Sequence, residues 1–91
     1  MVIERRRVYF GGRVQGVGFR MTARRLALGF PLVGFVRNLD DGRVELVVEG
    51  DSADVSGFLK AIISEFGNSI RDQDESLEPV GVPPFAGFSI R

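Results

Sequence analysis

The chain has 91 residues, which suits one compact domain and leaves no room for a second hydrophobic core. Twelve basic residues balance twelve acidic ones, so the net charge gives no reason to expect nucleic acid or an anionic membrane as a partner. Neither cysteine nor histidine occurs, which excludes disulfides, thiolate or imidazole metal ligands, cysteine nucleophiles and triads with a histidine base. No apolar run reaches the length of a signal peptide or of a membrane span, so we expect a cytoplasmic protein. A monomer is the default expectation for its oligomeric state.

The first half of the chain is predicted to form a strand, a helix and a β-hairpin. Apolar residues alternate over 7–14, which indicates a strand, and several glycines then interrupt the pattern. Over 21–30 they recur at helical spacing, until a glycine and a proline end the stripe. Strands are predicted over 33–38 and 44–49, joined by an Asp-Gly turn signal.

The second half predicts another helix and further strands. Asp51 or Ser52 can cap a helix whose apolar stripe runs to Phe66. Residues 69–79 are polar and predict a poor edge strand, and a short last strand ends at residue 91. The order β-α-β-β-α-β indicates an α+β, ferredoxin-like sandwich, in which an antiparallel sheet carries two helices on one face.

The glycine-bearing loop between the first strand and the first helix is the main candidate site. Glycines permit positive φ, so the amides of residues 15–20 can converge on an anion at the helix N-terminus, where Arg20 adds a permanent charge. The only lysine is Lys60, far from this loop, which argues against a Walker phosphate loop. On spacing alone, the alternative that these glycines merely turn the chain stays open.

Two segments carry a resemblance to the acylphosphatase family. Residues 12–20 match its first signature, Gly-x-Val-Gln-Gly-Val-x-Phe-Arg. Residues 34–38, 42–44 and Gly50 match the second, which begins Gly-aromatic-Val-Arg/Lys-Asn, and residues 88–91 resemble the family's C-terminal strand. The resemblance implies one acylphosphatase-like domain over residues 1–91, with the ferredoxin-like fold already expected from periodicity.

The resemblance also implies an activity, the hydrolysis of carboxyl-phosphate anhydrides to carboxylate and inorganic phosphate without a metal or other cofactor. It places the phosphate-binding arginine on Arg20 and the water-positioning asparagine on Asn38. The implied phosphate-cradling amides are those of Gln15, Gly16, Val17, Gly18, Phe19 and Arg20. The expected partners are a small-molecule acyl phosphate and, as product-like ligands, inorganic phosphate or sulfate.

The sequence departs from the family pattern in a few places. Phe10 stands where an aliphatic residue is usual, and Phe35 replaces the commoner tryptophan, which we interpret as packing changes. Leu39 follows the asparagine where some members carry serine or threonine, so an auxiliary hydroxyl is missing there. Residues 67–84 match poorly, which leaves the strand predicted there and any selectivity it provides open.

The residue types suit this reaction. A carboxylate leaving group, whose conjugate acid has a pKa of about 4, needs no general acid. Phosphoryl transfer then requires mainly that water be positioned and that the equatorial oxygens be stabilised. Arg20 and the loop amides are suited to the second task and Asn38 to the first, while a phosphoryl oxygen of the substrate takes the proton.

Other interpretations compete with this one. Asn38 alone could be a turn former, and the whole chain could be a non-catalytic anion-binding module or an RNA-binding ferredoxin-like domain. The RNA alternative is weakened by the single tyrosine, the absence of tryptophan and the zero net charge. Arg24, Arg25 and Arg37 are interpreted as solvated surface, and residues 5–7 as charges that protect an edge strand. Asp40 and Asp41 are expected at a solvated hairpin tip, with no metal geometry.

Overall fold

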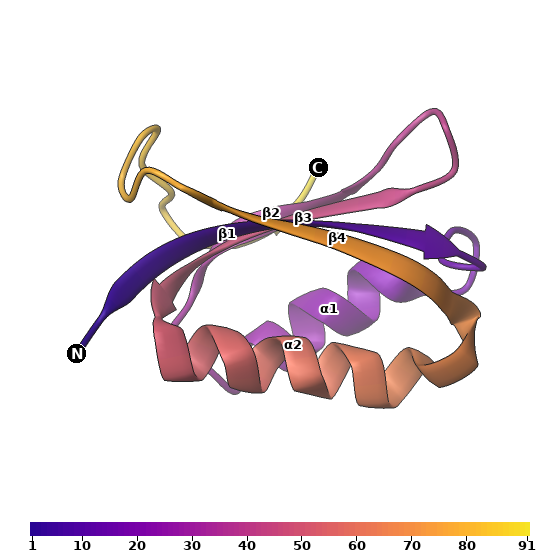
Figure 1. The fold of residues 1–91 in the computed structure, drawn as a ribbon, viewed down its shortest axis with the longest axis horizontal. Helices are drawn as coiled ribbons and strands as arrows, with labels where there is room; N and C mark the ends of the chain where they lie inside the picture. The colour runs from indigo at the N-terminus through magenta and orange to yellow at the C-terminus, as the bar shows by residue number, and fades with distance from the viewer.

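The computed structural model describes residues 1–91 and has two layers, a five-stranded sheet with both helices on one face (Figure 1). The elements in chain order are β1 (Ile3–Gly12), α1 (Phe19–Ala27), β2 (Val33–Asn38), β3 (Val44–Asp51), α2 (Ser52–Phe66), a 3-10 turn (Gly67–Ser69), β4 (Ile70–Glu78) and β5 (Phe88–Ile90). The predicted α+β, ferredoxin-like fold class is therefore confirmed. None of the helices is both long and apolar enough to span a membrane.

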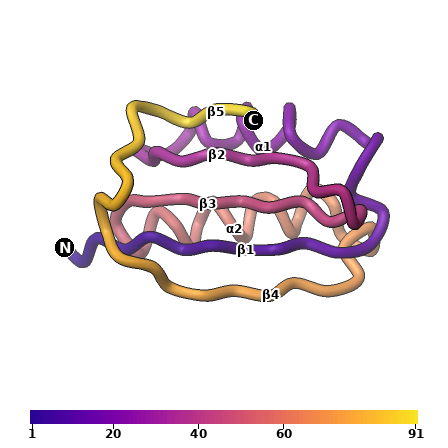
Figure 2. Tube along the Cα trace, turned by 90° about the horizontal axis from the view of Figure 1, so that it is seen from above, coloured from indigo at the N-terminus to yellow at the C-terminus, as the bar shows by residue number.

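The strands lie side by side in the order β4-β1-β3-β2-β5, as the view onto the sheet in Figure 2 shows. β1 pairs with β3 and β4, and β2 pairs with β3, in every case antiparallel as expected. β5 pairs with β2 in parallel, so the complete sheet is mixed rather than purely antiparallel. The chain reaches this pairing by crossing from one edge of the sheet to the other after β4 (Figure 2).

Some boundaries differ from the sequence-based expectations. β1 begins at Ile3 rather than at residue 7, because its N-terminal half pairs with β3 and β4 although it carries consecutive arginines. Residues 5–7 therefore lie on an inner strand, and the expectation that they protect an edge is wrong. α1 begins at Phe19, earlier than the predicted residue 21. The polar segment predicted as an edge strand does form one, β4.

The hydrophobic core lies between the sheet and the two helices. Its members alternate along β1 and β3 and recur at helical spacing on α1 and α2, as the periodicity predicts; fifteen buried residues form one cluster that includes Val8, Phe10, Leu46, Phe58 and Ile62. Each such side chain contributes about 1.5–3 kcal/mol when fully buried. Asp51 caps α2 by accepting a hydrogen bond from the Ala53 N–H at 2.9 Å, as expected.

Candidate active site

Strand register brings the two sequence signatures together at one end of the sheet. In this register Val44 of β3 lies opposite Phe10 of β1 on one side and opposite Asn38 of β2 on the other. The loop that leaves β1 after Gly12 therefore passes close to the end of β2. The same loop leads directly into α1, so the helix N-terminus also faces this point.

The loop between β1 and α1 presents backbone donors that have no partner in the chain. Gly16 and Gly18 adopt φ values of 73° and 79°, a left-handed conformation that other residues rarely adopt. The N–H groups of residues 15–18 donate no hydrogen bond within the protein. The first helical bond runs from the Thr22 N–H to the Gly18 carbonyl at 3.0 Å, so the N–H groups of residues 19–21 lie ahead of it. Such a run of free donors at a helix N-terminus is suited to an anion.

The side chain of Gln15 fixes the loop to the β2–β3 turn. Its Nε2 donates hydrogen bonds to the carbonyl of Leu39 at 2.7 Å and to the carbonyl of Arg43 at 2.9 Å. Sequence reasoning treated Gln15 only as a source of a backbone amide and missed this role. The available signal was that Gln15 is the one amide side chain among the glycines and valines of the loop.

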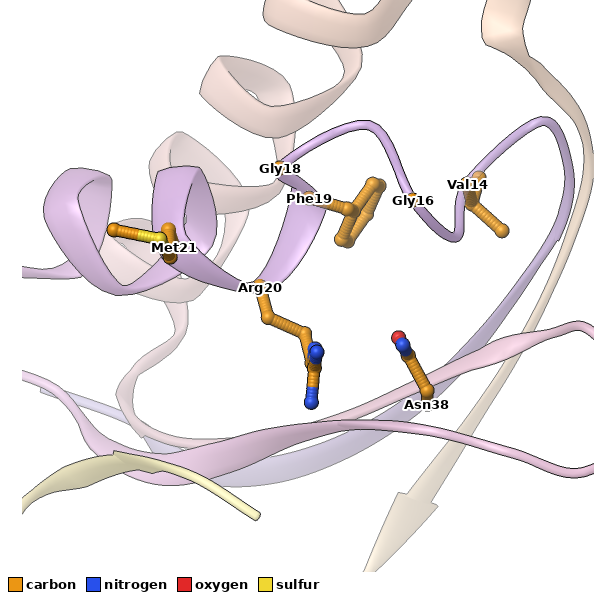
Figure 3. Close-up of a pocket in the computed structure, with 7 residues that line it drawn as sticks. All are labelled: Val14, Gly16, Gly18, Phe19, Arg20, Met21 and Asn38. Carbon is orange, nitrogen blue, oxygen red and sulfur yellow. The ribbon is translucent and has the colours of Figure 1, made fainter.

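Phe19 anchors the start of α1 below the loop. Its side chain is buried, with its ring centroid 5.2 Å from that of Phe10 and 4.4 Å from that of Phe66. The ring lies beneath the arch of the loop between Gly16 and Gly18 (Figure 3). Because Phe10 and Phe66 hold the Phe19 ring in the core, the first turn of α1, including Arg20, is held in place.

Arg20 is the one basic residue that is partly buried and has no ion pair. Seven of the arginines pair with carboxylates, and the remaining basic residues without an ion pair, Arg13, Arg24, Lys60 and Arg91, are exposed. The guanidinium of Arg20 extends from the first turn of α1 into the space below the loop (Figure 3). It therefore keeps its donors for a ligand.

Asn38 faces the same space from the end of β2. Its amide points up toward the loop, across from Arg20 (Figure 3). The Oδ1 atom is buried and has no hydrogen-bond partner, and it is the only buried side-chain polar atom of which this is true. Because a buried acceptor left unpaired costs about 1–3 kcal/mol, this atom is a candidate for a function rather than for holding the fold together.

A cavity of about 130 Å³ lies between these groups; it is lined by Val14, Gly16, Gly18, Phe19, Arg20, Met21 and Asn38. This size suits one small group with a few oxygen atoms, and no acidic side chain lines it. The cavity joins most of the predicted site residues. Gln15 and Val17 belong to the same loop but do not line it, and a role for their amides stays a prediction.

The groups with shifted pKa values lie away from this cavity. The carboxyl of Glu78 has a lowered pKa because the Arg7 guanidinium donates a hydrogen bond to it. The pKa of Asp41 is lowered by hydrogen bonds from the backbone and the side chain of Arg43, at 3.0 and 2.8 Å. Asp41 thus belongs to the hairpin tip, as expected, and no three acidic side chains cluster as a metal site would require.

Comparisons with known proteins identify the family of this chain. A family model described as Acylphosphatase matches residues 6–90. The chain is 43% identical to an acylphosphatase of Haloarcula marismortui, covering 100% of this chain and 99% of the relative, and 44% identical to one of Pseudomonas aeruginosa, covering 91% and 90%. The crystal structure of an acylphosphatase from Bacillus subtilis, 33% identical, superimposes with a TM-score of 0.86 over 99% of both chains.

Proposed function

Because the chain belongs to the acylphosphatase family, we propose that Arg20 and the loop amides bind the phosphoryl group of an acyl phosphate, that Asn38 positions the attacking water, and that the reaction needs no metal ion. The enzyme class, an acylphosphatase, follows from the family and the named relatives. The non-catalytic alternatives considered for the sequence are set aside on the same grounds.

One observation carries the residue assignment. The partly buried cation without an ion pair and the buried acceptor without a partner face the same cavity, below a loop whose amides are also free. The buried Oδ1 incurs a cost when it is left unpaired, and the exposed loop amides and the partly buried guanidinium keep their donors available. Their convergence is therefore best explained by a ligand that satisfies them together, namely an anion with an attacking water beside it.

The phosphoryl group fits the donor side of the cavity. Its equatorial oxygens would accept hydrogen bonds from the loop N–H groups and from the fork of the Arg20 guanidinium, which is shaped for bidentate contact with an oxyanion. As negative charge redistributes over these oxygens in the transition state, the fixed donors stabilise it without having to reorganise. The α1 N-terminus adds its dipole in the same direction.

Asn38 positions the nucleophile, which is a water molecule. The free Oδ1 accepts a hydrogen bond from a water molecule and holds it in line with the phosphorus–carboxylate bond. A neutral amide is not a base, so the water's proton passes to a phosphoryl oxygen as the new P–O bond forms. The P–O bond to the acyl group breaks, its electron pair leaves with the carboxylate, and the products are carboxylate and inorganic phosphate.

The leaving group explains why these few residues suffice. A carboxylate leaves unprotonated at neutral pH, whereas an alkoxide would need a general acid, and no titratable acid lines the cavity. We propose acyl phosphates as substrates and inorganic phosphate or sulfate as product-like ligands on this basis. We also propose that the chain acts as a single domain over residues 1–91, as a monomer and in the cytoplasm.

Phosphate release tests the proposal. We expect turnover of benzoyl phosphate and acetyl phosphate, with no detectable turnover of glycerol phosphate, an alkyl monoester, and the same rates after treatment with a chelator. Loss of activity on chelation, restored by a divalent cation, would overturn metal independence. Comparable turnover of the monoester would overturn the argument from the leaving group.

A further inference from the structure

A second cavity lies beside the proposed active site, between α1 and the edge strand β5. It has a volume of about 500 Å³ and is lined by Met21, Arg24, Arg25, Leu28 and Ile90. The lining residues of α1 recur at intervals of three, four and seven positions, so they form one stripe along the helix. We refer to this cavity as the α1–β5 groove.

The groove continues directly from the phosphoryl site. Met21 lines both cavities, and its side chain points away from the loop in Figure 3. Arg24 follows Arg20 by one helical turn, which places it about 6 Å further along the helix axis. The acyl group of a substrate whose phosphoryl group occupies the first cavity therefore lies within reach of the groove.

The apolar part of the groove is exposed to an unusual degree. Met21 is 74% and Leu28 84% exposed, and Ile90 adds to the same surface from β5. Scattered apolar side chains on a surface need no explanation, but these gather around one cavity that adjoins a reactive site. They offer contact to the carbon skeleton of a small ligand.

The charge of the groove is positive and only partly neutralised. α1 has no acidic residue, and of its three arginines only Arg25 pairs with a carboxylate, Glu65 of α2 at 3.4 Å. Arg24 has no ion pair, and the residue one turn before it on the same helix, Arg20, is also positive. Like charges at this spacing repel each other, so both would be stabilised by an anionic ligand that spans them.

From this juxtaposition we infer that the α1–β5 groove binds the acyl part of the substrate, and that Arg24 favours acyl phosphates whose acyl group carries a second negative charge. The inference rests on the proposed function, because it requires the phosphoryl group to occupy the neighbouring cavity. The apolar side chains contact the carbon skeleton, and the guanidinium of Arg24 contacts a carboxylate or phosphate at its far end. Arg24 is then a specificity-determining residue.

Turnover of two rigid substrates tests this inference independently of the proposed function. Benzoyl phosphate and 4-carboxybenzoyl phosphate share one skeleton and differ in the distal charge. The quantity measured is the ratio of their kcat/KM values, charged over uncharged, so the difference in their intrinsic reactivity cancels between variants. Lys60→Gln is the matched control, because it removes an exposed basic charge without an ion pair from α2.

We expect Arg24→Gln to lower the ratio about 3- to 5-fold at low ionic strength, the range expected for an exposed charge pair. Arg24→Lys should retain most of the parent's ratio, and Lys60→Gln should leave the ratio unchanged. Raising the salt concentration should reduce the difference in ratio between the parent and Arg24→Gln. These results together would support the inference.

An unchanged ratio in Arg24→Gln would overturn the inference. If neither kcat/KM changes, Arg24 does not act on the substrate, and if both fall equally, it acts on the phosphoryl end. In both cases the parent still hydrolyses benzoyl phosphate, so the proposed function survives. A parent that hydrolyses neither substrate would overturn the proposed function and this inference with it.

Discussion

On the open face of the sheet Arg7 contacts the carboxylates of Glu45 and Glu78, whereas Arg20, at the start of α1, contacts no carboxylate at all. The first arginine belongs to a network that also includes Arg37 and Tyr9, both bound to Glu45. There nearly every polar group has a partner from a neighbouring strand. Around the loop, by contrast, the guanidinium, the Asn38 Oδ1 and the backbone amides are free.

This difference separates two uses of the same residue type. In the sheet network arginine joins strands that are distant in sequence, and its donors are consumed in doing so. Around the loop the donors are held in position by other means, namely the buried Phe19, the Gln15 side chain and the fixed backbone. The comparison predicts that changes in the sheet network affect stability, while changes around the loop affect turnover.

The largest effect is expected at Arg20. Arg20→Gln removes a charged donor from the transition state and should lower kcat/KM for benzoyl phosphate by about 10²–10³-fold or more. The free energy of unfolding should change little, because Arg20 holds no ion pair. Steady-state kinetics and urea unfolding on the same preparation measure both quantities.

Arg20→Lys serves as its control. It retains the positive charge but loses the planar fork, so an intermediate loss is expected. A large fall in the free energy of unfolding of Arg20→Gln, with activity per folded molecule preserved, would show that Arg20 has a structural role like that of the arginines in the sheet network.

The opposite pattern is expected at Glu45, whose side chain is buried and contacts Arg7, Arg37 and Tyr9. Glu45→Ala should lower the free energy of unfolding by about 2 kcal/mol, less than for a fully buried pair because both arginines can regain water. Glu65→Ala, which removes the exposed partner of Arg25, should change it by less than about 0.5 kcal/mol. An unchanged free energy of unfolding in Glu45→Ala, or a loss of turnover per folded molecule, would contradict the structural role expected for Glu45.

Two glycines with the same φ provide a matched pair of variants, one near the proposed active site and one away from it. Gly18 in the loop and Gly81 between β4 and β5 both have φ 79°, and at neither position would an added Cβ meet another atom within 4 Å. Alanine at each should therefore cost about 1 kcal/mol of backbone strain without a clash. Only Gly18→Ala should also lower kcat/KM, by about 5- to 10-fold, because the amides it orders face the phosphoryl group. Equal kinetics for the two variants would argue against an ordered loop.

The smallest effect is a dependence of stability on pH. The pKa of Glu78 is lower in the folded protein than in the unfolded chain, because Arg7 donates a hydrogen bond to the ionised carboxylate. The stabilisation is therefore present above the ordinary pKa of glutamate, about 4.3, and is lost as the pH falls through the lower folded value. Urea unfolding should show that the free energy of unfolding declines less between about pH 6 and pH 3 in Glu78→Gln than in the parent.

Part of that decline should remain in the variant, because the pKa of Asp41 is lowered in the same direction. A decline as steep as that of the parent would show that the Arg7–Glu78 contact carries none of it. The residues that line the proposed active site contribute nothing to it, since none of them is acidic.

Local sequence features were enough to predict most of the fold, and the two signature segments gave the principal candidate site residues. The helical stripe of α2, its cap at Asp51 and the hairpin between β2 and β3 are set by residues near one another in the chain. Arg20 and Asn38 were each identified within a short signature segment. The structure brings them to one cavity, which the resemblance implied but no local pattern showed.

Features that depend on distant partners could not be predicted. The edge strand β4 was predicted although it carries almost no apolar residues, but its ion pairs to β1, between Glu75 and Arg6 and between Glu78 and Arg7, could not be read from the sequence. The parallel pairing of β5 depends on how the chain crosses the sheet. Gln15 bonds to two carbonyls that lie 24 and 28 positions further along the chain. None of these contacts has a periodic signal in the sequence.

The most direct test of the central claim separates binding from turnover at Asn38. Asn38→Ala should lower kcat for benzoyl phosphate by about 10²-fold, because the attacking water loses its acceptor. Its inhibition constant for inorganic phosphate should stay within about 2-fold of the parent's, because Arg20 and the loop amides are untouched. Turnover at the parent rate, or a parallel loss of phosphate affinity, would contradict the assignment of Asn38 to the water and of Arg20 and the loop to the phosphoryl group.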